Sequence, residues 1–115
     1  MQRAELYLDK VSICGIFIAD TFWTRFKGLM GKSPEKINDM GGLLIKPCSQ
    51  IHTFFMKASI DVVYLSKEWK VVFIDENVQP WKCCKHIKGA KCLIEFPKGK
   101  IKKLGIEENN TLEVV

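Results

Sequence analysis

The sequence lacks any apolar run near the roughly 20 residues that a membrane-spanning helix needs. It also lacks a recognisable secretory signal. The apolar residues 13–19 end at Asp20 without a convincing small-residue cleavage site, and Arg3 is the only basic residue before Glu5. We therefore expect a cytoplasmic protein with no membrane association.

Several motifs that carry chemistry are also missing. The sequence has no C-x-x-C pair, no glycine-rich phosphate loop, no paired-histidine metal motif and no serine elbow. The five cysteines form an odd set, which argues against a disulfide framework. We expect reduced cysteines that act as small apolar residues, with no metal and no cofactor. One alternative stays open: Cys83 and Cys84 could chelate a soft metal with Cys48 or His86, although their spacing matches no standard site.

The composition is that of a compact globular protein. Of 115 residues, 47% are hydrophobic and 27% charged, which is enough apolar material for one core but not for two domains. No internal repeat, linker or low-complexity segment divides the chain. We expect one domain, residues 1–115.

Short strand-like runs dominate the chain. They occupy residues 4–8, 11–18, 43–45, 51–56, 60–65, 70–74, 92–96 and 112–115, and turn-forming residues separate most of them. One helix is predicted at about 21–31, because its aromatic and aliphatic residues recur at helical spacing and Gly31 can end it. Residues 33–42 are expected to be a loop. The pattern predicts a mainly β (β-rich α+β) fold, a small barrel or sandwich of six or more short strands with the helix packed across it.

A single core is expected under this helix. It would contain apolar residues of the helix and of the predicted strands: Phe22, Trp23, Phe26, Leu29, Leu43, Leu44, Phe54, Val62, Val63, Phe73, Leu93 and Ile94.

The segment 51–65 is the most informative stretch. In strand geometry His52, Phe54 and Met56 would share one face, and Asp61 opens the apolar run that follows. Arg25 borders the apolar stripe of the predicted helix. We expect these five residues to line a ligand-binding cleft, with Arg25 and Asp61 converging at its rim.

Structural roles for the same residues remain open. Arg25 can bond strand-end carbonyls, Asp61 can accept backbone N–H groups at a turn or pair with Arg25, His52 can be a packed histidine, and Met56 can fill the core.

The net charge of +5 has a local origin. Between Lys82 and Lys103 the sequence carries eight lysines and one acidic residue, Glu95. We expect a solvated basic face, because lysine keeps surfaces soluble. Weak polyanion binding is the alternative, but nucleic acid is not an expected partner, since the segment lacks the interleaved arginines and aromatic residues that base stacking needs.

Taken in order, these pieces make the chain similar to the domain-of-unknown-function 192 family of small bacterial and archaeal proteins, from about Thr21 to the C-terminus. The resemblance rests on six pieces at matching spacing: Arg25-x-x-Gly28-Leu29-Met30, Gly42-Leu43-Leu44, Phe55-Met56-Lys57 leading into Ile60-Asp61-Val62-Val63, Pro80-Trp81, Leu93-Ile94-Glu95, and Gly99 through Gly105-Ile106. It implies a compact, mostly β fold and supplies no substrate.

The function that these residues favour is a non-enzymatic binding module. It would hold a small polar molecule, or a segment of a protein partner, near Arg25, His52 and Asp61. One alternative is a small enzyme in which His52 and Asp61 transfer a proton. Asp61 and Glu95 lack an identifiable nucleophile partner, so hydrolysis by paired carboxylates or a triad is not supported. The other alternative is weak polyanion binding by the Lys82–Lys103 face.

Overall fold

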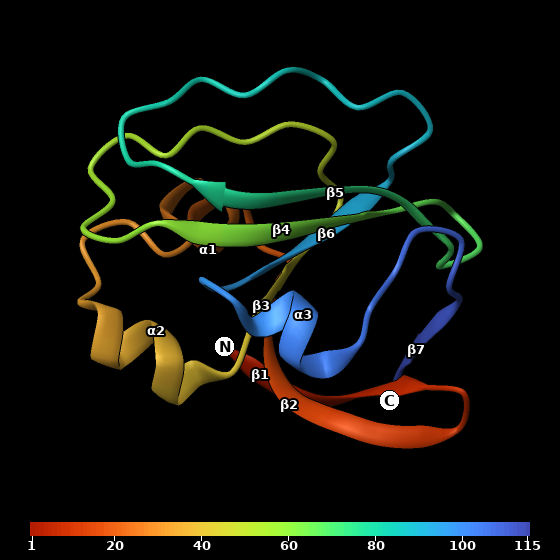
Figure 1. The fold of residues 1–115 in the computed structure, drawn as a ribbon. Helices are drawn as coiled ribbons and strands as arrows, with labels where there is room; N and C mark the ends of the chain where they lie inside the picture. The colour runs from red at the N-terminus through yellow and green to blue at the C-terminus, as the bar shows by residue number, and fades with distance from the viewer.

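The computed structural model describes all 115 residues and contains one seven-stranded mixed sheet with three short helices (Figure 1). The elements are β1 (Gln2–Leu8), β2 (Val11–Ala19), α1 (Phe22–Lys27), α2 (Pro34–Met40), β3 (Leu43–Ile45), β4 (Ile60–Leu65), β5 (Val71–Val78), β6 (Cys92–Pro97), α3 (Lys100–Leu104) and β7 (Leu112–Val114). The strand order is β5-β4-β6-β3-β2-β1-β7. Only β2 and β3 pair in parallel.

The sheet curls until its two edges touch at one end. The Val71 N–H at the start of β5 donates to the Asn110 carbonyl at 2.8 Å, and the Leu112 N–H of β7 donates to the Trp69 carbonyl at 3.0 Å. These bonds and one bridge between Lys70 and Thr111 are local. The sheet therefore stays open and is not a closed barrel, so of the expected β-rich architectures the barrel is excluded.

Alternation along the strands produces two apolar clusters, one on each face of the sheet. The cluster inside the curl includes Leu44, Val63, Ile94 and Phe96, and Ile101 of α3 covers it. The cluster on the outer face contains residues of alternate strand positions together with residues of α2 and the loops: Leu29, Ile37, Met40, Leu43, Ile45, Ile51, Met56, Val62, Tyr64 and Leu93. The single core expected from the sequence is thus divided by the sheet.

The three helices are short. The helix expected at 21–31 stops at Lys27, because Gly28 adopts a φ of +49° and takes the chain away from the helix axis. The loop expected at 33–42 is instead α2, with the Ser33 side chain accepting from the Lys36 N–H. None of the helices is long and apolar enough to cross a membrane.

Part of the expected core is wrong. Leu29, Leu43, Leu44, Val62, Val63, Leu93 and Ile94 are buried, and Phe73 is partly buried. The helix aromatics are exposed: Phe22 by 76%, Trp23 by 66% and Phe26 by 55%. A six-residue helix buries none of its side chains here, and the residues that pack follow it at Leu29 and beyond.

Candidate functional site

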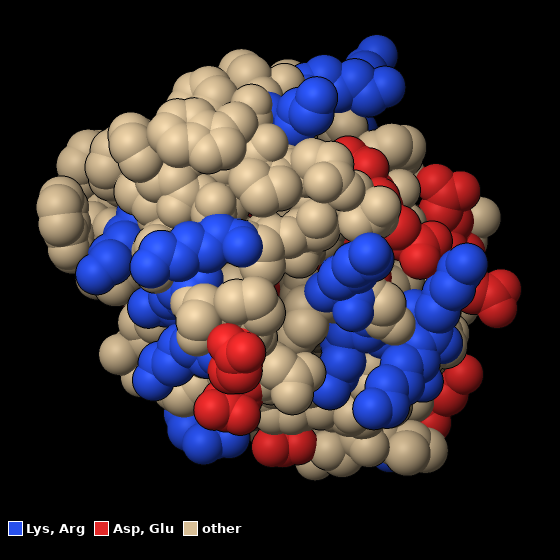
Figure 2. All heavy atoms as spheres, turned by 60° about the vertical axis from the view of Figure 1, so that its left-hand side comes forward, with Lys and Arg blue, Asp and Glu red and all other residues tan.

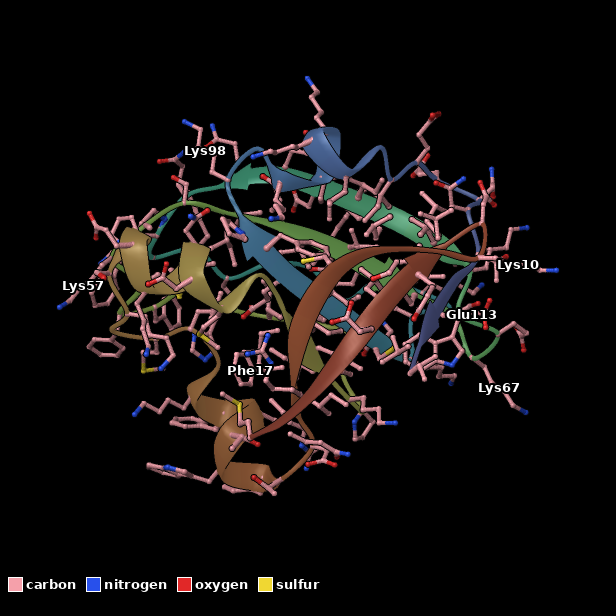
Figure 3. All side chains as sticks on the ribbon, turned by 90° about the horizontal axis from the view of Figure 1, so that it is seen from below. Lys10, Phe17, Lys57, Lys67, Lys98 and Glu113 are labelled. Carbon is pink, nitrogen blue, oxygen red and sulfur yellow. The ribbon has the colours of Figure 1, made fainter.

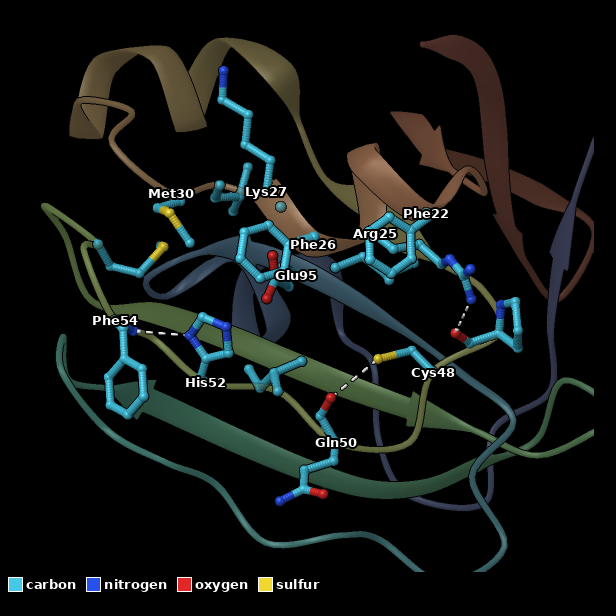
Figure 4. A pocket seen from close by; sticks show the side chains of 16 residues that line it. Phe22, Arg25, Phe26, Lys27, Met30, Cys48, Gln50, His52, Phe54 and Glu95 are labelled. Carbon is cyan, nitrogen blue, oxygen red and sulfur yellow. Dashed lines mark hydrogen bonds between the residues drawn. The ribbon is translucent and has the colours of Figure 1, made fainter.

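A pocket of about 410 Å³ lies over the outer face of the sheet (Figure 4). Its walls come from α1 and the turn after it, the end of β3, and the loop that follows β3. The lining residues are Phe22, Arg25, Phe26, Lys27, Gly28, Leu29, Met30, Ile45, Pro47, Cys48, Gln50, Ile51, His52, Phe54, Met56 and Glu95. The lining is mostly apolar with a few charged groups, which is typical of small-molecule sites.

Glu95 is the unusual member of this lining. It lies in the middle of the sheet, paired with Leu43 of β3 and Val62 of β4, and is only 4% exposed. No protein group donates a hydrogen bond to its buried Oε1. Burial raises the pKa of Glu95 from 4.5 to about 7, because a charge is poorly solvated there. The site thus holds an acid that changes charge near neutral pH.

Gly28 allows the backbone to pass close to this carboxylate. A Cβ added at Gly28 would lie 3.4 Å from Glu95 Oε1 and 3.8 Å from Ile45 Cδ1, and the φ of +49° disfavours a side chain at this position. The turn at Gly28 therefore ends α1 directly beside Glu95, and the positive φ is what favours glycine there.

Arg25 lines the pocket and also ties two segments together. Its Nε donates to the Thr21 carbonyl at 3.3 Å and its guanidinium donates to the Pro47 carbonyl at 3.4 Å. Both bonds are long, and a guanidinium has five N–H donors, so further donors are free for another partner. Figure 4 shows the Arg25 and Lys27 side chains pointing away from Glu95.

His52 lies between two aromatic rings on another side of the pocket. Its ring centroid is 4.9 Å from that of Phe54 and 6.4 Å from that of Phe26. The His52 Nδ1 accepts from the Phe54 N–H at 3.3 Å, which leaves the other ring nitrogen to carry the proton of the neutral form.

The segment that carries His52, Phe54 and Met56 is not the expected strand. Only His52 forms a bridge, to Cys83, and a turn follows in which the Met56 N–H donates to the Thr53 carbonyl at 3.2 Å. The buried Thr53 fixes this loop: its Oγ1 donates to the Gln79 carbonyl at 2.6 Å and accepts from the Lys82 N–H at 2.8 Å. His52, Phe54 and Met56 nevertheless all reach the pocket.

Asp61 does not line the pocket, which corrects the expected convergence with Arg25. Its carboxylate is buried and accepts three backbone N–H groups, from Asn77 at 2.9 Å, Gly99 at 2.9 Å and Ile101 at 3.4 Å. Because β4 alternates, Asp61 faces the inner side of the sheet and caps α3, where no N-cap side chain is present. The structural role left open in the sequence is the one observed.

Glu95 is the residue that sequence reasoning missed. In the sequence it is only a carboxylate without an identifiable nucleophile partner. The signal available in the sequence was its position inside the apolar run 92–96. Burying a charged side chain on a strand that is covered on both faces costs free energy unless the charge is paired or hydrogen-bonded.

The lysines between Lys82 and Lys103 do not form one face. The loop 79–91 packs against the outer cluster through Cys84, Ile87 and Ala90, whereas α3 packs on the inner cluster through Ile101. The basic segment is therefore divided between the two sides of the sheet.

All five cysteines are free thiols. No group of three or more His, Cys, Asp or Glu side chains is arranged to hold a metal ion. Burial is the main cause that raises the pKa of Cys48, the thiol in the pocket, and its Sγ donates to the Gln50 carbonyl at 3.1 Å. A protonated thiol is a poor nucleophile.

Comparison with solved structures supports the fold. A protein of unknown function from Novosphingobium aromaticivorans superposes with a TM-score of 0.77 at 17% identity, covering 96% of this chain and 83% of that one. A Sinorhizobium meliloti protein gives a TM-score of 0.76 at 18% identity, covering 97% and 92%.

Sequence comparisons identify the family. The sequence model of the DUF192 family, which carries the description "Uncharacterized ACR", matches residues 9–114. A UPF0127 protein of Thermococcus sibiricus is 36% identical over 99 residues; the match covers 84% of this chain but only 63% of that protein. A UPF0127 protein of Pyrococcus furiosus is 31% identical over 100 residues, covering 83% and 82%. The chain therefore belongs to the DUF192 (UPF0127) family.

Proposed function

We propose that the chain is a binding module whose pocket takes a small zwitterion, with an ammonium group held by Glu95. The observation that carries the proposal is the Glu95 carboxylate: it is 4% exposed, lines the pocket, and has an Oε1 that no protein group satisfies. A buried acceptor without a donor is costly, and a ligand that supplies the donor removes that cost.

An ammonium group matches this acceptor in charge and in hydrogen bonding. It offers three N–H donors and favours the ionised carboxylate. Phe26, His52 and Phe54 add aromatic rings to the lining, and rings attract cations as well as apolar groups. The apolar lining fits a short alkyl chain beside the ammonium.

The anionic end of the ligand would meet Arg25 and Lys27, which line the same pocket. A guanidinium with free donors binds a carboxylate well. A lysine side chain carries the same ammonium and alkyl groups. A lysine-containing segment of a partner protein would therefore occupy the pocket in the same way. The Asp61 carboxylate accepts three backbone N–H groups and does not line the pocket. These contacts argue against the alternative enzyme in which His52 and Asp61 transfer a proton.

The test is isothermal titration calorimetry with 6-aminohexanoate, hexylamine, 1-hexanol and hexanoate. We expect 6-aminohexanoate and hexylamine to bind and the two compounds without an ammonium group not to bind. Because only ionised Glu95 binds the ammonium, the apparent affinity should rise about tenfold from pH 6 to pH 8.

The matched variants are Glu95→Gln in the pocket and Glu68→Gln in the exposed turn between β4 and β5. Glu95→Gln should weaken binding at least about tenfold and abolish its pH dependence, whereas Glu68→Gln should change neither. Equal binding of 1-hexanol, or tighter binding at pH 6 than at pH 8, would refute the proposal.

A further inference from the structure

The molecule has six exposed aromatic side chains at one site on its surface, which we call the aromatic end: Phe22, Trp23, Phe26, Phe54, Phe55 and Trp81. They make up six of the nine large hydrophobic side chains that are exposed anywhere on the chain. Phe55 and Trp81 are each 60% exposed and Trp23 is 66% exposed. Scattered apolar residues are normal on a surface, but a contiguous group of this size marks an interaction site.

Five of the six rings are connected by ring-to-ring contacts, and Phe22 lines the pocket together with Phe26 and Phe54. Ring centroids link Trp23 to Phe26 at 6.1 Å, Phe54 to Trp81 at 6.1 Å and Phe55 to Trp81 at 4.7 Å. His52, between Phe26 and Phe54, joins the two halves. Three segments distant in sequence therefore form one continuous aromatic surface.

Two of these aromatic residues are held outward by a strained backbone. Phe55 has a φ of +62° and Trp81 a φ of +65°, a region that bulky residues avoid. The Gly31 N–H donates to the Phe55 carbonyl at 3.0 Å, and the Trp81 N–H donates to the Thr53 carbonyl at 2.8 Å. Strain that the surrounding structure maintains in this way points to use of the exposed rings.

The same segments are basic and contain no acid. Residues 21–32, 50–59 and 79–86 carry six of the 18 basic residues and none of the 13 acidic residues: Arg25, Lys27, Lys32, Lys57, Lys82 and Lys85. Figure 2 shows a broad uncharged area with lysine and arginine side chains along much of its border and acidic side chains along its right-hand edge. In Figure 3, Lys57 lies at the opposite end of the molecule from Lys10, at the turn between β1 and β2.

We propose that the aromatic end docks on the surface of an anionic lipid bilayer. Aromatic side chains are favoured at the membrane–water interface, and basic side chains next to them are attracted by anionic headgroups. The strength of interfacial binding rises with the apolar area buried and with the electrostatic attraction to anionic lipids, and this surface supplies both. The sequence-based expectation of no membrane association concerned a spanning segment and a signal, and surface docking needs neither.

Nucleic acid fits the same charge less well. Successive bases stack on rings that present parallel faces along a basic groove, whereas these rings are inclined to one another by 30°, 34° and 58°. Five of the six cations are lysines, which bind phosphate without the bidentate geometry of arginine.

The test is flotation of the full chain with phosphatidylglycerol vesicles and with pure phosphatidylcholine vesicles at about 0.15 M salt. The variant combines Trp23→Ser, Phe55→Ser and Trp81→Ser, none of which lines the pocket. The control is Val11→Ser, whose residue is 62% exposed beside Lys10 at the β1–β2 turn. Thermal unfolding would establish that both variants fold.

Wild type and Val11→Ser should float with phosphatidylglycerol vesicles and not with phosphatidylcholine alone, and the triple variant should lose at least about tenfold in partitioning. In a Trp69→Phe background, which leaves Trp23 and Trp81, the fluorescence emission should shift to the blue on vesicle addition. No flotation of wild type, or equal flotation of the triple variant, would overturn the proposal. Retained binding to single-stranded DNA at this salt concentration without vesicle binding would assign the aromatic end to nucleic acid instead.

Discussion

Replacing Glu95 by Gln should make the protein increasingly stable relative to wild type as the pH rises from 5 to 8. Burial raises the pKa of Glu95 to about 7, whereas the unfolded chain has the ordinary value of 4.5. Between these pH values the native state binds more protons than the unfolded state. Protonation of Glu95 in the native state therefore contributes fully to the free energy of unfolding below pH 4.5. This contribution is lost as the pH rises through about 7.

The magnitude follows from the two pKa values. At pH 8 the ionisation of Glu95 lowers the free energy of unfolding by about 3 kcal/mol, and at pH 5 by about 1 kcal/mol. The Gln amide cannot ionise, so its own burial adds a term that does not depend on pH. The stability difference between Glu95→Gln and wild type should therefore grow by about 2 kcal/mol from pH 5 to pH 8.

Urea unfolding at both pH values measures this difference, and the exposed Glu68→Gln supplies the control. The midpoint should shift without a change in the m-value, because the same surface is exposed on unfolding. The control should show no pH-dependent gain beyond about 0.5 kcal/mol. A Glu95→Gln effect that is equal at pH 5 and pH 8 would mean that Glu95 is not a desolvated acid, and the reasoning would fail.

Four further outcomes are expected. Asp61→Ala should lower the free energy of unfolding by about 3–5 kcal/mol in chemical denaturation, because three N–H groups lose a buried carboxylate acceptor; a loss under about 1 kcal/mol would contradict the capping role. Gly28→Ala should weaken 6-aminohexanoate binding and destabilise by about 1–2 kcal/mol, since φ is +49° and the new methyl group lies beside Glu95 Oε1; calorimetry and unfolding check both. Phe26→Ala should cost less than about 1 kcal/mol because the ring is 55% exposed, whereas Leu29→Ala should cost about 2–5 kcal/mol. Among the cysteines, iodoacetamide should label exposed Cys83 first by mass spectrometry, because burial raises the pKa of the thiols of Cys14, Cys48, Cys84 and Cys92.

The β-rich fold was largely predictable because period-two apolar patterns and turn residues are local signals. The strands around Leu43–Ile45 and Ile60–Leu65 were found within a residue. The short helices were harder. Ser33-Pro34 is a good helix start, but the seven-residue α2 buries only Ile37 and Met40, too few positions to produce a clear helical period.

Residues 51–56 show why alternation alone misleads. The apolar residues suggested a strand, yet Thr53 is tied to the loop at Gln79 and Lys82, and Phe55 turns the chain at positive φ. These contacts join residues about 26–29 positions apart, so no local pattern contains them. His52, Phe54 and Met56 nevertheless all line the pocket, from a loop and not from one face of a strand.

The sequence alone does not show which of the two buried carboxylates, Asp61 or Glu95, lines the pocket. Asp61 and Glu95 both lie on buried strands. Asp61 accepts N–H groups of Asn77 in β5 and of Gly99 and Ile101 at α3, whereas Glu95 Oε1 has no donor. Which carboxylate is satisfied depends on where α3 and Gly28 lie in three dimensions. A carboxylate in an apolar run is therefore a candidate for either role, and only the donors around it in the fold show whether it is satisfied, as Asp61 is, or left without a partner, as Glu95 Oε1 is.

The most direct test of the account is the ¹³C carboxyl titration of Glu95 by NMR, with and without 6-aminohexanoate. The free protein should show a Glu95 pKa of about 7. Saturating ligand should lower this pKa, because an ammonium beside the carboxylate favours the ionised form. An ordinary pKa in the free protein, or a raised pKa that the ligand leaves unchanged, would contradict the proposal that Glu95 is the ammonium-binding group of this pocket.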